Sequence, residues 1–197
     1  MAAVAVAAGG VRAEVILDTL TDQLDGTVLM TAANDHRYAQ SFVTSATTET
    51  LTELSLDLSA SGTTSFDVAL WLNFNNQPLA RLDYLSRPRD VTLTSPYVIS
   101  GLTEVVSPST QYWIVVQRIA GADISWGFTD DQGVANGYRV GAEGPWNITS
   151  GTALRTGVSV VPEPSTGIIA LAGLAGGGFF MWRRRSARAS ARAQREQ

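Results

Sequence analysis

The chain has 197 residues, of which 45% are hydrophobic and 16% are charged, so it is long enough for one ordinary domain with short appendages. It contains no cysteine, no lysine and a single histidine, His36. Thiol nucleophiles, zinc–thiolate sites, disulfides, Schiff-base lysines and P-loop ATPase chemistry are therefore excluded.

The net charge of −4 is distributed unevenly along the chain. Residues 1–13 carry +1, residues 14–182 carry seven arginines against seventeen acidic residues, and residues 183–197 carry +5. An acidic body argues against nucleic acid as a partner, because phosphate binding needs a clustered basic face and the sequence shows none. Arg87 and Arg89 are the closest basic pair, which we interpret as a solvated turn. We also expect this acidic surface to disfavour anionic polymers unless cations bridge them.

The N-terminus consists of small apolar residues up to Ala8. Val11 and Ala13 fit the −3 and −1 positions of a small-residue cleavage site, but no positively charged segment precedes the apolar run. We interpret residues 1–13 as the remnant of a signal peptide whose true start lies upstream. The alternative is a disordered alanine-rich terminus.

The body alternates apolar and polar residues with a period of two. Leu54, Leu56 and Leu58 alternate with polar residues, which places the apolar set on one face of a strand. Residues 66–72 repeat the pattern, and the Asn-rich turn at residues 75–78 leads into the next strand.

Further strands are predicted where similar short patterns lie between turn residues. No convincing amphipathic helix appears. The sequence thus predicts an all-β domain at residues 14–160, an antiparallel β-sandwich that is jelly-roll-like rather than immunoglobulin-like. The predicted strands are 14–17, 27–31, 38–43, 54–60, 66–73, 79–85, 91–99, 111–119, 124–128, 137–140 and 153–160.

The C-terminus has three parts in order. Residues 161–166 predict a short stiff linker, because its two prolines favour extended backbone. Residues 167–182 are uncharged and predict a short transmembrane helix of about 24 Å, somewhat less than the hydrocarbon core. The basic residues 183–197 would remain cytoplasmic by the positive-inside rule, which leaves the domain outside the cytoplasm.

These three parts resemble the PEP-CTERM sorting signal of exported proteins of Gram-negative, exopolysaccharide-producing bacteria. Pro162, Glu163 and Pro164 match its motif, residues 167–182 match its helix, and the basic stop-transfer cluster consists of Arg183, Arg184 and Arg185. The resemblance implies recognition by an exosortase, a membrane cysteine protease-transpeptidase, with cleavage near the motif. The alternative is a simple C-terminal anchor without processing.

A second resemblance covers roughly residues 36–160. It resembles the choice-of-anchor R domain, a family thought to be β-rich, which carries interchangeable anchoring tails and has no assigned activity. The resemblance therefore implies placement at the cell surface and no catalytic residues. The segments that carry it are Ala39–Phe42, the strand Phe66–Leu72 with the turn that follows, Ser100–Leu102 and Thr110–Val116.

His36 is the candidate general base of a hydrolase, and it lies between Asp35 and Arg37. The members of a Ser-His-Asp triad need not be close in sequence, so the arrangement stays open. No Gly-x-Ser-x-Gly elbow is present, and we favour a loop histidine that precedes a strand.

Acidic side chains at Asp123, Asp130 and Asp131 offer the oxygen ligands that calcium prefers. Their spacing matches no EF-hand loop. The sequence leaves two interpretations, a structural calcium site and a set of solvated turns.

Tryptophans at residues 71 and 113 fall on the strand faces opposite the strongest apolar sets. Exposed aromatic rings stack on the apolar faces of sugars, so Trp71 and Trp113 are candidate glycan contacts. The alternative is packing between the sheets. The other aromatic residues of this kind are Trp126, Trp146, Tyr38, Tyr84, Tyr97, Tyr112 and Tyr138.

Taken together, the sequence predicts a non-enzymatic exported protein. An exosortase would process it, and it would stay at the cell surface or in the extracellular matrix, with the membrane as a partner before processing. No cofactor is expected apart from the calcium alternative. The other functional hypotheses are a module that binds carbohydrate, such as exopolysaccharide, and a hydrolase that uses His36.

Overall fold

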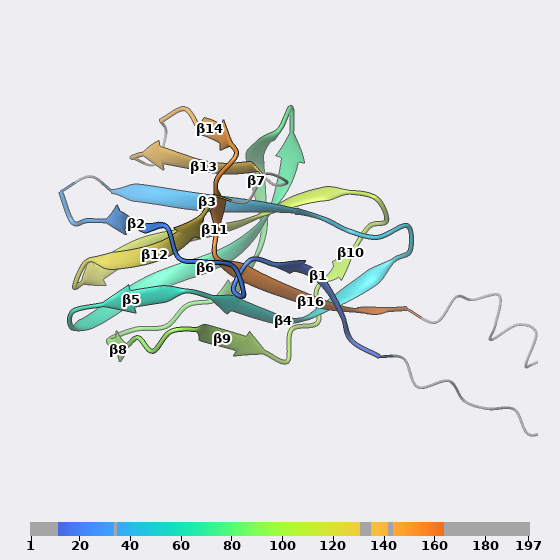
Figure 1. Cartoon of the computed structure of the whole chain (residues 1–197), viewed down its shortest axis with the longest axis horizontal. Helices are drawn as coiled ribbons and strands as arrows, with labels where there is room; N and C mark the ends of the chain where they lie inside the picture. The colour runs from blue at the N-terminus through green and yellow to red at the C-terminus, as the bar shows by residue number, and fades with distance from the viewer. Residues whose placement is uncertain (1–11, 34, 131–134, 142–143, 164–197) are drawn as a thin grey trace, which may run out of the picture. The chain divides into compact units, whose positions relative to one another are not determined.

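The protein is described here by a computed structural model (Figure 1), which covers residues 12–33, 35–130, 135–141 and 144–163. Within these residues the chain forms sixteen strands in antiparallel pairs and no helix, which confirms the prediction of an all-β antiparallel domain. Nothing in this described part of the chain is a helix able to cross a membrane. The predicted helix at residues 167–182 lies outside the described residues.

The strands form three sheets. Sheet A contains β1 (Glu14–Asp18), β16 (Thr156–Pro162), β4 (Glu49–Leu56), β9 (Tyr97–Ser100) and β10 (Val105–Val106). Sheet B contains β15 (Ala153–Leu154), β12 (Ile124–Thr129), β2 (Gly26–Met30) and β5 (Leu58–Ala60). Sheet C contains β14 (Asn147–Ser150), β13 (Ala135–Val140), β3 (His36–Val43), β11 (Gln111–Gly121), β6 (Thr63–Phe74), β7 (Gln77–Ser86) and β8 (Val91–Thr92).

One hydrophobic core receives side chains from all three sheets. Sheet C contributes Phe66, Val68 and Leu70, and sheet A contributes Leu54 and Leu56, all of them at most 1% exposed. These residues belong to the period-two sets that the sequence shows, so the alternation identified the buried face of both strands. Each buried leucine or phenylalanine contributes about 1.5–3 kcal/mol to folding.

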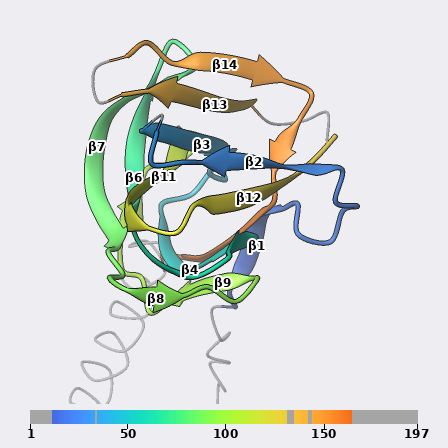
Figure 2. The ribbon, with the colours of Figure 1, turned by 90° about the vertical axis from the view of Figure 1, so that its left-hand side faces the viewer.

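The chain passes repeatedly between sheets A and C. It runs from β1 in sheet A to β3 in sheet C, returns to β4 in sheet A, and enters sheet C again at β6. The last strand of the domain, β16, then inserts between β1 and β4. Figure 2 shows the result, with β13 and β14 at one end of the domain and β8 and β9 at the other.

Two connections carry the chain directly between sheets A and B. β4 becomes β5 at Asp57, and β15 becomes β16 at Arg155. The two crossing points are joined, because Asp57 N–H donates to the Arg155 carbonyl oxygen at 3.1 Å and the Arg155 guanidinium forms an ion pair with the Asp57 carboxylate. Trp126 donates its indole N–H to the same carbonyl oxygen at 3.0 Å.

Several element boundaries differ from the sequence predictions. The segment predicted as one strand at residues 91–99 forms β8 in sheet C and β9 in sheet A, because the chain changes sheets between them. The predicted strand at 153–160 divides at Arg155 for the same reason. The sequence did not predict β14, whose residues Asn147–Ser150 are mostly polar and exposed.

We expect Asp57→Ala to lower the free energy of unfolding by about 2–3 kcal/mol, because it leaves the mostly buried Arg155 guanidinium without its carboxylate. Asp57→Asn should cost less, since the amide still accepts a hydrogen bond. Urea unfolding monitored by tryptophan fluorescence measures both changes. The control is Asp22→Ala at an exposed position, with an expected change of at most about 0.5 kcal/mol. Equal stability of Asp57→Ala and Asp22→Ala would contradict the role of the ion pair.

Candidate functional site

The sorting motif begins inside the folded domain. Pro162 is the last residue of β16, and it lies opposite Glu49 in the register of β16 with β4. Glu163 follows directly and is exposed. Pro164 and the basic cluster Arg183–Arg185 lie outside the described residues, as do residues 1–11 of the predicted signal-peptide remnant.

The predicted linker at residues 161–166 needs a correction. Val161 and Pro162 pair with Thr50 and Glu49, so the strand extends two residues beyond its predicted end. Pro162 is tolerated there because a proline at the end of a strand removes little of the hydrogen bonding between the strands. The domain therefore reaches the first residue of the Pro-Glu-Pro motif.

The two candidate glycan contacts differ in their surroundings. Trp113 is 0% exposed and donates its indole N–H to Asn73 Oδ1 at 2.9 Å. Its proposed role as a glycan contact is wrong, because packing on the outer face of sheet C covers the ring completely. Trp71 is half-buried, and its ring meets that of Trp146 edge to face at 6.3 Å.

The candidate calcium ligands do not converge. Asp123 and Asp130 lie just before and just after β12, whose six residues separate them by roughly 20 Å. Calcium ligands lie 2.3–2.6 Å from the ion, so these two side chains cannot share one. Asp123 instead forms an ion pair with Arg118 at 3.8 Å, and Asp131 lies outside the described residues. Among the residues that the structure describes, no group of three metal-ligating side chains is found.

His36 is the first residue of β3, and its ring packs against aromatic neighbours. Its centroid lies 5.9 Å from that of Tyr38 and 6.2 Å from that of Tyr138. The Nδ1 atom is buried and has no hydrogen-bond partner among the described residues. No serine or carboxylate in that part of the chain is hydrogen-bonded to the ring, so the geometry of a catalytic triad is not assembled around it.

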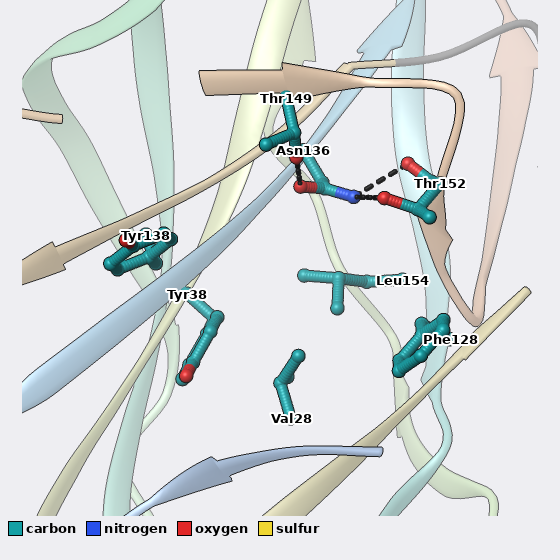
Figure 3. Close-up of a pocket in the computed structure, with 8 residues that line it drawn as sticks. All are labelled: Val28, Tyr38, Phe128, Asn136, Tyr138, Thr149, Thr152 and Leu154. Carbon is teal, nitrogen blue, oxygen red and sulfur yellow. Dashed lines mark hydrogen bonds between the residues drawn. The ribbon is translucent and has the colours of Figure 1, made fainter. Parts of the chain in front are cut away.

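A pocket of the described domain lies between sheets B and C and has a volume of about 260 Å³ (Figure 3). Sheet C supplies Tyr38 from β3 and Tyr138 from β13. Most of the lining is apolar, and a short polar rim closes one side. The remaining lining residues are Val28, Phe128 and Leu154 on the apolar walls and Asn136, Thr149 and Thr152 on the rim.

Tyr38 and Tyr138 are directly opposite each other in the register of β3 with β13, and their ring centroids are 6.1 Å apart. Burial raises the pKa of the Tyr38 phenol above its ordinary value, and the neighbouring Tyr138 phenol adds to that rise. Tyr138 is 39% exposed at the mouth of the pocket. The pair thus offers an uncharged aromatic surface that a ligand can reach.

Asn136 ties the rim together. Its Nδ2 donates to the carbonyl oxygen of Thr152 at 2.5 Å and to the Thr152 hydroxyl at 2.7 Å, and its Oδ1 accepts a hydrogen bond from the Thr149 hydroxyl. Its amide is therefore used within the protein, which fixes the rim.

Tyr38 and Tyr138 both lie in predicted strands, but nothing in the sequence predicts that they meet. They are 100 positions apart and pair only because β13 adds to the edge of β3.

Folding raises the Tyr38 pKa above 10.0, so the folded chain holds the phenolic proton more tightly than the unfolded chain does. This difference contributes to the stability of the fold. The contribution is complete below the Tyr38 pKa of the unfolded chain and is lost as the pH rises through the Tyr38 pKa of the folded chain. We expect the free energy of unfolding to fall above about pH 10, and to fall less in Tyr38→Phe. Tyr138→Phe should show a pH dependence between those of wild type and Tyr38→Phe, because it removes one of the two causes of the raised Tyr38 pKa. Urea unfolding across this pH range tests the difference, and parallel curves for wild type and Tyr38→Phe would contradict it.

Comparison with known families identifies a PEP-CTERM protein-sorting motif at residues 160–185. A search of curated proteins gives no significant match. The matched range includes the end of β16, the Pro-Glu-Pro residues and the arginine cluster. The chain therefore carries the sorting motif of exported proteins that an exosortase processes, which places it in the cell envelope or at the surface of a Gram-negative bacterium.

Proposed function

We propose that this chain is a non-enzymatic exported protein that an exosortase cleaves near Pro162–Pro164 and that remains at the cell surface or in the extracellular polymer matrix. The observation that carries the proposal is the overlap between the sorting motif and the last strand. The motif match begins at residue 160, inside β16, and the strand ends at Pro162.

This overlap makes processing compatible with a stable domain. β16 is paired with β1 on one side and with β4 on the other, so it is an inner strand of sheet A. Cleavage beyond the exposed Glu163 leaves every paired residue of β16 in the domain. The processed protein would thus keep its fold and present its new C-terminus directly at the domain surface.

The remaining sorting elements complete the proposal. In this proposal residues 1–13 belong to a signal peptide, residues 167–182 hold the tail in the membrane before processing, and Arg183–Arg185 stop transfer on the cytoplasmic side. The non-enzymatic assignment is supported by the surroundings of His36, which are aromatic and contain no hydrogen-bonded serine or carboxylate among the described residues.

We also assign the domain to the jelly-roll class, in line with its resemblance to the choice-of-anchor R domain. Support comes from the strand order β1-β16-β4-β10 in sheet A and β3-β11-β6-β7 within sheet C. In both sheets the strands that are central in space come from distant parts of the chain, as two interleaved Greek keys require. Sheet B and the pair β13–β14 are additions to this plan.

A second candidate function is the binding of neutral glycans in the pocket of Tyr38 and Tyr138. A concave, mostly apolar pocket with an exposed aromatic ring is the usual form of a small-ligand site. Pyranose rings present apolar C–H faces that stack on such rings. A matrix protein with this pocket could hold polymer while its fold stays intact.

The first experiment determines the mature C-terminus by mass spectrometry in the native bacterium with and without its exosortase. We expect cleavage near the motif only when the enzyme is present. The combined substitution of Pro162, Glu163 and Pro164 by alanine should leave the tail uncleaved, and Glu104→Ala, at a position away from the motif, should be processed normally. Identical processing in cells that lack the exosortase would refute the proposal.

The second experiment measures binding of cellohexaose, laminarihexaose and mannohexaose by calorimetry. Tyr138→Ala should weaken binding of the preferred sugar about tenfold, because stacking on an exposed ring contributes on the order of 1 kcal/mol. Phe74→Ala removes an even more exposed aromatic ring, at the end of β6, and should leave binding unchanged. Unchanged binding by Tyr138→Ala would exclude this pocket as the site.

A further inference from the structure

Five of the seven arginines of the acidic body lie on or beside the outer face of sheet C, the face that is turned away from the main core. This corrects the expectation that the body forms no basic cluster, because the arginines come from three separate segments of the chain. We call this set the arginine face. Its members are Arg37 on β3, Arg139 on β13, Arg81 on β7, and Arg87 and Arg89 just after β7.

The register of the sheet explains the arrangement. Arg139 is opposite Arg37, Arg37 is opposite Gln117, and Gln117 is opposite Asp67, so these side chains form one row across four strands. Side chains two residues further along each strand share the same face. The next row on this face consists of small or short side chains, at Gly137, Ala39, Val115 and Ala69.

A trough floored by small residues therefore crosses the sheet. Its far wall is formed by Trp113 and Trp71, which are opposite each other in β11 and β6, and by Arg81, which is opposite Trp71. Trp146 fills one part of the trough by packing edge to face on Trp71. The part that stays open is a shallow hollow of about 20 Å³ above the floor of Ala69 and Val115. Its other lining residues are Arg37, Asp67, Arg81, Gln117, Trp71 and Tyr84.

The arginines of this face are not equally neutralised. Asp67 forms ion pairs with Arg89 at 2.6 Å and with Arg87 at 3.4 Å. Arg81 lies over the Tyr84 ring at 3.9 Å and donates to its hydroxyl. Within the described part of the chain, Arg37 has no ion pair, and its Nε is buried without a hydrogen-bond partner.

Among the described residues, the arginines of this face outnumber the carboxylates that approach it. These carboxylates are Asp67, Asp35, which accepts a hydrogen bond from Gln117, and Asp90, which accepts one from Ser65. A buried donor without an acceptor is unfavourable, and the Nε of Arg37 is such a donor among the described residues. An anion bound beside Arg37 would relieve this cost.

We propose that this hollow receives the carboxylate of a hexuronate unit of an acidic polysaccharide, while the sugar ring lies outside it. Guanidinium groups bind carboxylates through paired hydrogen bonds, and Arg37 and Arg81 line the same hollow. The guanidinium groups of Arg81 and Arg87 lie over the Tyr84 ring, so the half-buried Trp71 ring provides the apolar surface for the sugar. The Gln117 amide can bind a hydroxyl group. A uronate combines these two chemistries within one ring, which an acidic peptide does not.

The assignment goes beyond the proposed sorting function and is separate from the tyrosine pocket. Tyr38 and Tyr138 alternate with Arg37 and Arg139 along β3 and β13, so the two sites lie on opposite faces of sheet C. It also reverses the expectation that the acidic surface repels anionic polymers, because charge on this face has the other sign. Export to the cell surface would bring the face into contact with such polymers.

Calorimetry with hexagalacturonate, its methyl ester and alginate oligomers tests the proposal on the full chain. We expect wild type to bind one of the two acidic oligomers, to lose affinity as salt is added, and to bind the ester much more weakly. Arg37→Gln and Arg81→Gln should each weaken binding about tenfold. Thr103→Glu makes the same change in net charge at an exposed position in the loop between β9 and β10 of sheet A, and it should bind like wild type.

Four results would overturn the proposal. Three of them are absence of binding to both acidic oligomers, equal binding of ester and acid, and equal affinity of wild type and both arginine variants. Poly-L-glutamate serves as the acidic-peptide probe, and binding of that probe as tight as binding of the uronate would also refute a sugar site. Arg81 is exposed, so Arg81→Gln keeps the test decisive if Arg37→Gln lowers stability. Glycan binding here can fail while exosortase processing is normal, which separates the two proposals.

Discussion

The pairing register of β11 with β3 on one side and β6 on the other is the constraint on which the rest of the structure depends. In this register Ile114 and Leu70 face the main core, whereas Trp113 and Trp71 face the opposite side. A slip of one residue would exchange the two sets, because successive side chains of a strand point to opposite faces. Packing of the core therefore fixes the register, and the register decides which side chains lie on the outer face. One result is the row formed by Arg139, Arg37, Gln117 and Asp67.

A second constraint acts where the chain changes sheets. Asp57 and Arg155 stand at the two crossings between sheets A and B, and their ion pair and shared backbone hydrogen bond hold the crossings together. β16 begins immediately after Arg155 and continues without interruption to Pro162. A single strand thus connects the crossing at Arg155 with Pro162, the first residue of the Pro-Glu-Pro motif.

Sheet C gives the domain two different surfaces. One face carries the uncharged tyrosine pocket against sheet B, and the other carries arginines beside tryptophan and tyrosine rings. Burial raises the pKa of Tyr38 on the first face, whereas cations and carboxylates dominate the second. Both surfaces use β3, which supplies Tyr38 to one and Arg37 to the other, so a polymer-binding role for either one uses the strands of the sheet rather than loops.

The sequence by itself determined the features that depend on local chemistry. The absence of cysteine and lysine excluded whole classes of reaction, the period-two pattern identified most strands and their buried faces, and the order of prolines, apolar residues and arginines at the C-terminus identified the sorting motif. Only the tertiary structure decided which distant strands pair. Trp113 became a core residue, Asp123 and Asp130 were kept apart by β12, and scattered arginines became one face. Strand pairing is a long-range interaction that depends on the packing of both sheet faces, and neither composition nor periodicity of a single segment contains that information.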